Sequence, residues 1–120
     1  MVVYISGAIT NNPYYLRQFD SAESKIINML GRNRARVINP ARLMMTLPKE
    51  TPYECYMYIS KQLIKVADMV VLLGGWEKSE GCKQELIVAK NEGVFITTLK
   101  EFIEGQCSNG RFDFRRNTGD

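Results

Sequence analysis

Short apolar runs alternate along this chain with longer stretches in which apolar residues recur at helical spacing. The runs are rich in β-branched residues and end at turn-forming residues, a pattern typical of buried strands. They predict four strands, at residues 2–5, 35–38, 69–73 and 94–97. Because the longer stretches fall between these runs, the pattern predicts alternating strands and helices.

The first helical stretch follows Asn12 and Pro13, which predict an N-cap and the first helical position. Gly31 is expected to end this helix. Residues at spacings of three and four form one apolar face, which we expect to be buried. These residues are Tyr15, Phe19, Ala22, Ile26 and Met29.

Two further helices are predicted by their N-terminal residues. Thr51 and Glu54 match a capping box, and the helix that they open is expected to bury Tyr56, Ile59, Leu63 and Val66. Ser79 is the expected N-cap of a helix from Glu80 to Glu92. Residues 41–50 are expected to form a connection, and residues 99–103 a short helix.

Alternating strands and helices predict an α/β fold with a parallel sheet. The expected architecture is a flavodoxin-like three-layer sandwich with a four- or five-stranded parallel sheet. Residues 1–104 are expected to form a single nucleotide-binding α/β domain. Residues 105–120 form a C-terminal tail, for which two interpretations stay open. Alternation of Phe112 and Phe114 with charged residues favours an edge strand, and the alternative is a partly ordered end.

Composition excludes several classes of function. The chain has 120 residues, a net charge of +3 and no histidine. The mild charge argues against a nucleic-acid partner, and the missing histidine removes His-based triads and most zinc ligand sets. Three dispersed cysteines fit reduced thiols in a cytoplasmic protein better than a disulfide framework. We expect no signal peptide, no membrane span, no metal and no cofactor.

Candidate chemistry lies in two loops that the flavodoxin-like topology places side by side. One loop follows the first strand and comprises Ser6, Gly7, Ala8, Ile9 and Thr10; the other is residues 74–85, between the third strand and the next helix. Both offer hydroxyls, glycines and backbone N–H groups near helix starts, where phosphate binds favourably. These loops indicate a nucleotide-like ligand.

Several residues in and near these loops allow both a functional and a structural interpretation. Ser79 is either a helix cap alone or also a ligand contact. Glu85 lies just past the first helical turn and is either solvated or catalytic, while Gly81 beside it is small enough to admit a ligand. Tyr4 is either core or a donor that orients a carboxylate. Trp76, the only tryptophan, either stacks on a base or fills a gap between helices.

The motifs resemble, in their order and spacing, those of the nucleoside 2-deoxyribosyltransferase-like family, including its short phage-type members and the deoxynucleoside 5'-monophosphate N-glycosidases. The resemblance extends to about residue 97. It rests on Tyr4-Ile5-Ser6-Gly7, Val37-Ile38-Asn39-Pro40, Ala67-Asp68, and Gly75-Trp76-Glu77-Lys78-Ser79 followed by Gly81 and Glu85.

The resemblance implies cleavage or transfer at the N-glycosidic bond of a 2'-deoxynucleoside or its 5'-monophosphate. It implies that Glu85 is the nucleophile and that Tyr4 hydrogen-bonds it. Ser79 is implied to contact the sugar or the 5'-phosphate. The loop after the first strand, Asn39, Trp76 and Gly81 complete the expected substrate-binding set. Family members commonly assemble as homo-oligomers, and the tyrosine-rich helix after Thr51 makes such an interface plausible.

One position departs from the family pattern. The family carries an aspartate that assists the leaving base, and the corresponding residue here is Ser60. General acid–base assistance contributes roughly 100- to 10,000-fold, so the alternative function is a catalytically weak or silent nucleotide-binding protein. Glu54 is a possible substitute for the aspartate. A third interpretation, a nucleoside-monophosphate phosphoribohydrolase, rests on Gly74, Gly75, Gly81 and Glu85, but its usual arginine has no clear counterpart.

Overall fold

The computed structural model describes residues 1–109, and the side chains of residues 1–105. Its centre is a sheet of four parallel strands in the order β2-β1-β3-β4. The strands are β1 (Val2–Ser6), β2 (Arg36–Ile38), β3 (Met69–Leu72) and β4 (Phe95–Thr98). The predicted flavodoxin-like order is therefore confirmed.

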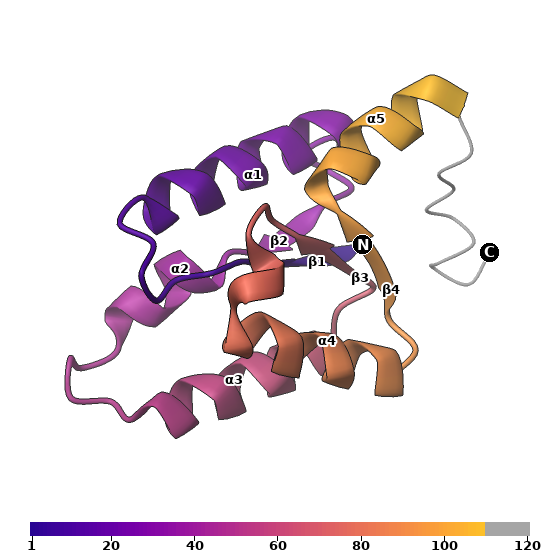
Figure 1. The fold of residues 1–120 in the computed structure, drawn as a ribbon. Helices are drawn as coiled ribbons and strands as arrows, with labels where there is room; N and C mark the ends of the chain where they lie inside the picture. Colours follow the sequence, from indigo (N-terminus) through magenta and orange to yellow (C-terminus); the bar gives the residue numbers. More distant parts are fainter. Residues whose placement is uncertain (110–120) are drawn as a thin grey trace.

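Helices cover both faces of the sheet and complete a three-layer sandwich (Figure 1). Helices α1 (Tyr15–Leu30) and α5 (Leu99–Asn109) lie on one face, with the short α2 (Pro40–Leu43) beside them. Helices α3 (Tyr53–Lys65) and α4 (Glu80–Asn91) cover the opposite face. Two 3-10 turns, η1 (Met44–Thr46) and η2 (Trp76–Lys78), lie in the connections.

Alternate residues of the central strands build two separate cores, because successive strand side chains point to opposite faces. Val3 and Ile5 pack with Phe19 of α1 and Phe102 of α5. Tyr4 lies on the other face. The residues that share its core are Ile64, Ala67, Val70, Leu72 and Ala89. The polar residues of β1 that could serve a site therefore face α3 and α4.

Two predicted helix starts are wrong by one to two residues. Helix α1 begins at Tyr15, and Asn12 instead donates to the carbonyl of Ala8 while its Oδ1 accepts from the Tyr14 N–H. Helix α3 begins at Tyr53, and the Thr51 hydroxyl donates to the Pro48 carbonyl rather than capping the helix. In both places the polar side chain stabilises the preceding turn, an alternative open to Asn and Thr side chains.

The predicted buried face of α3 is also wrong, by one position. The structure buries Met57, Ser60 and Ile64, whereas Val66 is 64% exposed. Tyr56 and Ile59, which we expected inside, are only partly buried. The apolar residues of this helix occur on more than one side, so their spacing alone does not define the inner face. The consequence is that Ser60 points into the protein.

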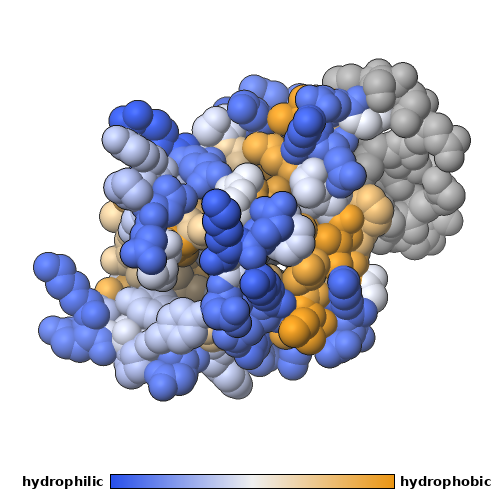
Figure 2. Space-filling view, viewed as in Figure 1, coloured by the Kyte–Doolittle hydropathy of each residue, from blue (hydrophilic) through white to orange (hydrophobic). Residues whose placement is uncertain are grey.

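Other segments differ in extent from their predictions. The connection after β2 contains α2 and η1, and α5 continues to Asn109, past the expected short helix and past Gly105. The edge-strand prediction for residues 111–115 lies outside the described residues. Within residues 1–109, no helix has the length and apolarity needed to cross a membrane. Polar residues cover most of one face of the molecule, and apolar ones gather where α4 meets β4 (Figure 2).

Candidate active site

A buried carboxylate lies where α4 packs on β1. Glu85 is in the middle of α4, and its residue is only 8% exposed. Its two carboxylate oxygens each accept a hydrogen bond from a strand hydroxyl. Tyr4 Oη donates to Oε2 at 2.6 Å, and Ser6 Oγ donates to Oε1 at 2.7 Å. Because Tyr4 and Ser6 are two residues apart on β1, both side chains point to the α3–α4 face.

The electrostatics of this carboxylate are unusual, because within residues 1–109 no cation forms an ion pair with it. The ion pair of that part of the chain joins Arg42 and Asp20. Burial raises the pKa of Glu85, while the hydroxyls of Tyr4 and Ser6 oppose this by stabilising the charged form. Burial, followed by the charge of Glu85, raises the pKa of Tyr4 well above its ordinary value. Tyr4 is therefore a permanently protonated donor at neutral pH.

Ser60 joins the same cluster from α3. Its residue is 6% exposed, and hydrogen bonding by its side chain lowers the pKa of both Glu85 and Tyr4. Cys82 of α4 lies close by, since Ser6 hydrogen-bonds its thiol and Glu85 raises its pKa, although burial is the main cause of that rise. Tyr4, Ser60 and Glu85 were predicted to carry the chemistry, and the structure brings all three together with Ser6.

The first turn of α4 lies beside this cluster. Ser79 is the N-cap, as predicted, and its hydroxyl oxygen accepts from the Cys82 N–H at 3.2 Å. Gly81 is partly buried and faces α3: a Cβ there would lie 3.4 Å from Tyr53 Oη and 3.6 Å from Met57 Sδ. The Tyr53 hydroxyl therefore lies next to Gly81, at the start of α4.

Tyr53 is a residue near the site that sequence reasoning missed. Burial and then the charges of Glu85 and Glu80 raise its pKa, which places its phenol close to both carboxylates. It precedes Ser60 by seven residues, or two helical turns, so both lie on one side of α3. The spacing could have indicated that Tyr53 lies near the site. Using it, however, required knowing which face of α3 points into the protein.

The loop after β1 runs close to the cluster. A Cβ on Gly7 would lie 3.0 Å from both Leu73 Cδ1 and Phe19 Cζ, so the chain passes tightly between these side chains. The Ala8 carbonyl accepts from Asn12, and Ile9 is 40% exposed. These contacts fix the backbone directly after Ser6, which positions the Ser6 hydroxyl for Glu85.

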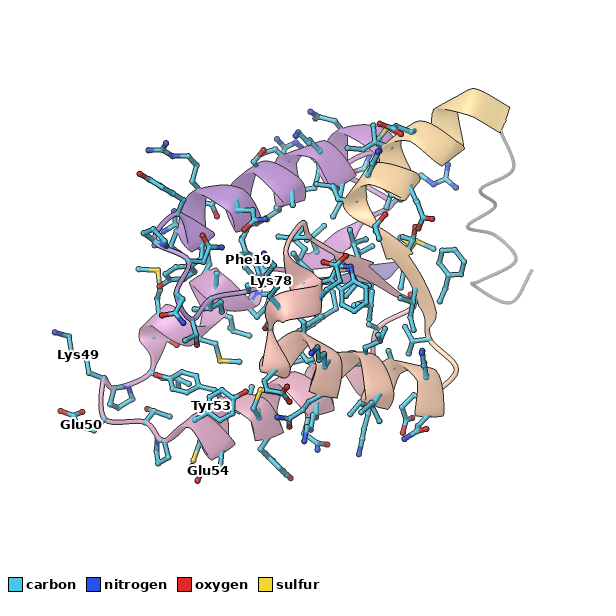
Figure 3. The ribbon with its side chains drawn as sticks, viewed as in Figure 1. Phe19, Lys49, Glu50, Tyr53, Glu54 and Lys78 are labelled. Atoms are coloured by element: carbon cyan, nitrogen blue, oxygen red, sulfur yellow. The ribbon has the colours of Figure 1, made fainter. Side chains whose placement is uncertain are left out.

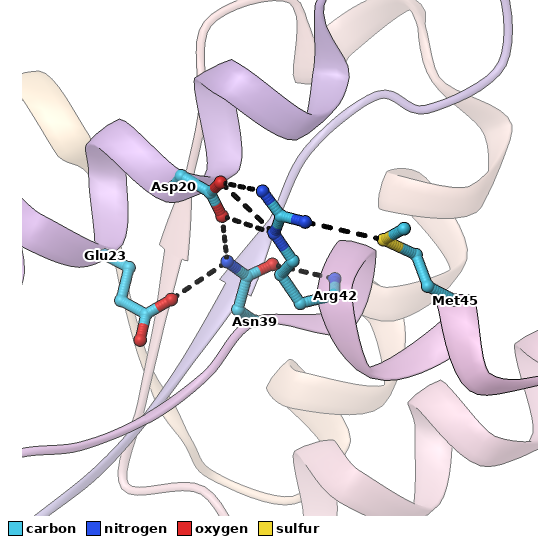
Figure 4. A network of polar contacts seen from close by, with 5 residues as sticks. All are labelled: Asp20, Glu23, Asn39, Arg42 and Met45. Atoms are coloured by element: carbon cyan, nitrogen blue, oxygen red, sulfur yellow. Dashed lines mark hydrogen bonds and ion pairs between the residues drawn. The ribbon is translucent and has the colours of Figure 1, made fainter.

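Asn39 lies apart from the carboxylate cluster. Its Oδ1 accepts from the Arg42 N–H as the N-cap of α2, and its Nδ2 donates to Asp20 and Glu23 of α1 (Figure 4). Arg42 Nε also donates to Asp20 and holds the pKa of that carboxyl below its ordinary value. All of these contacts tie α2 to α1, so they give Asn39 a structural role.

Two other candidates make no hydrogen bond to Glu85 among the described residues. Trp76 is partly buried and packs against the apolar core under α3 and α4, the core that also contains Tyr4. Glu54 lies at the exposed side of α3 (Figure 3). The possible replacement of the missing aspartate by Glu54 therefore has no support from its position.

Other features of the surface do not converge on Glu85. A groove runs along the outer side of α1, next to α2. The residues that line it are Pro13, Tyr14, Leu16, Arg17, Asp20, Ser21, Ser24 and Arg42. In the part of the chain that the structure describes, no group of three or more Cys, Asp or Glu side chains is placed to hold a metal ion.

Comparison with known proteins identifies a family for most of the chain. Residues 1–98 match the family described as "Domain of unknown function (DUF4406)". No curated protein and no solved structure matches the chain. The family description names no activity, so any function has to be argued from the geometry of the site.

Proposed function

The chain belongs to the DUF4406 family, and we propose that it cleaves or transfers at the N-glycosidic bond of a 2'-deoxynucleoside or deoxynucleoside 5'-monophosphate, with Glu85 as the nucleophile. The observation that carries this proposal is the buried Glu85 carboxylate, whose two oxygens are held by the hydroxyls of Tyr4 and Ser6. A buried ion without a cationic partner is costly to the fold. Perturbed carboxylates of this kind concentrate at functional sites.

The hydrogen bonds suit a nucleophile in a double displacement. They fix both oxygens in position and keep part of the charge on them, while burial maintains the basicity of the carboxylate. An oxocarbenium-like transition state needs a negative charge beside the anomeric carbon. Glu85 supplies this charge, and Tyr4 and Ser6 orient it.

The reaction proceeds in two steps. A Glu85 oxygen forms an ester bond to the anomeric carbon as the glycosidic C–N bond breaks, and the base leaves with the bonding electron pair and takes up a proton. Water, or a nitrogen of a second base, then attacks the same carbon and releases the Glu85 carboxylate. When water is the acceptor, its proton passes to solvent and the free sugar is the product.

Ser60 determines how well the leaving base is assisted. A serine hydroxyl is too weak an acid to protonate the base, so the enzyme relies on solvent or on bases that leave easily. Ser60→Asp introduces a carboxyl beside Glu85, where the like charge and burial favour its protonated form. We therefore expect Ser60→Asp to raise the rate of base release by up to roughly 100-fold, and Ser60→Ala to give no such gain.

The test is a panel of deoxynucleosides and their 5'-monophosphates, with the ribo-forms included, assayed for free base by chromatography. Wild-type protein is expected to release base from at least one deoxy-substrate, and Glu85→Ala is expected to release none. Preference for ribo-substrates would favour a phosphoribohydrolase. If no substrate gives more base than the Glu85→Ala control, the enzymatic proposal is wrong.

The second candidate function is nucleotide binding without turnover, and the specific observation that favours it is Ser60. This protein would be stabilised against heat by a nucleoside or nucleotide and would release no base. Stabilisation by no member of the panel would contradict both candidates.

We also propose that the protein is a cytoplasmic homo-oligomer. The support is the exposure of aromatic surface on α3, where Tyr53 is 52% and Tyr58 is 65% exposed. Light scattering tests the assembly, and a monomeric mass at assay concentration would contradict it.

A further inference from the structure

Helix α3 presents a graded row of side chains toward α4. Tyr53, Met57 and Ser60 follow one another at spacings of four and three residues, so they share one side of the helix. Their exposed fractions fall from 52% through 8% to 6%. The row therefore runs from the surface at Tyr53 down to the buried cluster at Ser60.

Two residues of α4 lie opposite this row of α3. Gly81 and Glu85 are four residues apart and lie on one side of α4. Tyr53 Oη and Ser79 Oγ are 3.4 and 3.8 Å from the point at which a Gly81 Cβ would lie. Figure 3 shows Tyr53 beside the start of α4. The Tyr53 phenol is therefore about one helical turn, roughly 5.4 Å, above the nucleophile along α4.

The Tyr53 hydroxyl is free to bind a ligand. Among the described residues it has no hydrogen-bond partner, in contrast to the Tyr4 hydroxyl. Burial and the nearby charges of Glu85 and Glu80 raise its pKa above the ordinary tyrosine value. It is therefore a neutral hydroxyl at physiological pH, able to donate one hydrogen bond.

We propose that Tyr53 is a specificity residue of the Glu85 site, whose hydroxyl donates a hydrogen bond to an oxygen carried by the sugar, either a hydroxyl or the 5'-phosphate. This inference rests on the proposed function. Displacement at the anomeric carbon places the leaving base on the side opposite Glu85, while other substituents of the sugar lie to the side. Because Tyr53 lies beside α4 at the level of Gly81, it is within reach of such a lateral substituent.

The experiment compares Tyr53→Phe with wild type, using Tyr58→Phe as a matched control from the exposed side of the same helix. Phenylalanine keeps the ring that packs near Gly81 and removes only the hydroxyl. Substrates are a 2'-deoxynucleoside that the wild type turns over, its 3'-deoxy and 5'-deoxy analogues, and its 5'-monophosphate. The readouts are kcat and KM for each substrate, and Tm for each protein.

We expect Tyr53→Phe to raise KM for the parent substrate by roughly 3- to 10-fold, the value of one neutral hydrogen bond, with little change in kcat. Wild type is expected to discriminate against the analogue that lacks the contacted hydroxyl, and Tyr53→Phe to lose that discrimination. A larger effect on the monophosphate identifies the phosphate as the acceptor. Tyr58→Phe is expected to match wild type throughout.

Failure of this inference is distinct from failure of the proposed function. An active wild type with unchanged KM and unchanged discrimination in Tyr53→Phe overturns the role of Tyr53 alone. If wild type binds the parent substrate without turnover, dissociation constants from calorimetry replace KM and the same criteria apply. If wild type neither binds nor turns over any member of the panel, both the function and the role of Tyr53 are wrong.

Discussion

Replacing Glu85 by glutamine should stabilise the fold at neutral and alkaline pH. Burial raises the pKa of Glu85, so the folded protein holds this proton more tightly than the unfolded chain does. Below the ordinary glutamate pKa, both states are protonated and the charge has no effect on stability. As the pH rises from there through the raised pKa of the folded state, the unfolded chain loses its proton first, and stability falls.

The expected size follows from the contacts of the carboxylate. Burying one ion costs several kcal/mol even after relaxation. The hydroxyls of Tyr4 and Ser6 offset this by about 1.5–3 kcal/mol each. Because the pKa of Glu85 stays raised despite the hydrogen bonds of Tyr4, Ser6 and Ser60, a net cost remains, and Glu85→Gln removes it because the amide has the same shape and both hydroxyls can reorient as donor or acceptor. A gain of 1 kcal/mol corresponds to a rise in Tm of about 4 °C for a domain of this size.

Urea denaturation of wild type and Glu85→Gln between pH 4 and pH 9 measures this effect. Glu92→Gln is the matched control, because Glu92 is an exposed glutamate at the end of the same helix, and such surface changes stay within about 0.5 kcal/mol. The difference in the free energy of unfolding between Glu85→Gln and wild type should grow with pH. If the difference in the free energy of unfolding between Glu85→Gln and wild type is no larger at pH 8 than at pH 4, the reasoning is refuted.

Three further changes test neighbouring parts of the structure. Tyr4→Phe removes a donor that lowers the pKa of Glu85, so the acid limb of the kcat/KM profile should move to higher pH; an unchanged limb would contradict the assignment. Gly7→Ala forces a Cβ to within 3.0 Å of Leu73 and Phe19, and should destabilise the protein by about 1–3 kcal/mol in urea denaturation; a neutral effect would show that the loop relaxes. Asn39→Ala removes a helix cap and two hydrogen bonds to α1, and should cost about 1–2 kcal/mol without changing KM.

The strands and their order were predictable because short β-branched runs separated by helices permit few topologies. The order of the strands allowed Tyr4 to be proposed as a donor to a carboxylate, whereas the role of Glu85 as nucleophile and the place of Ser60 came from the family resemblance. The hydrogen bonds and the burial of these residues could be known only from the structure, because the spacing of residues along the chain determines neither. The resemblance singled out Ser60, but that its side chain points toward Glu85 required the inner face of α3.

The errors share a physical cause. Polar residues near helix starts can bond to several nearby backbone groups, as Asn12 and Thr51 do. Asn39 was grouped with the site by the family resemblance, and in the structure its side chain donates to carboxylates of α1. Tyr53 was missed because its importance depends on how closely α3 approaches Gly81, a distance between two helices that a linear pattern does not contain.

The central claim is that Glu85 forms a covalent bond to the sugar, and the most direct measurement is the mass of the protein during turnover. Wild type is mixed with an excess of a deoxynucleoside that it cleaves, quenched in acid and digested. We expect the peptide containing Glu85 to carry one deoxyribosyl group, and the adduct to be absent from Glu85→Gln. Base release by wild type with an unmodified Glu85 peptide, or an adduct that persists in Glu85→Gln, would contradict the account.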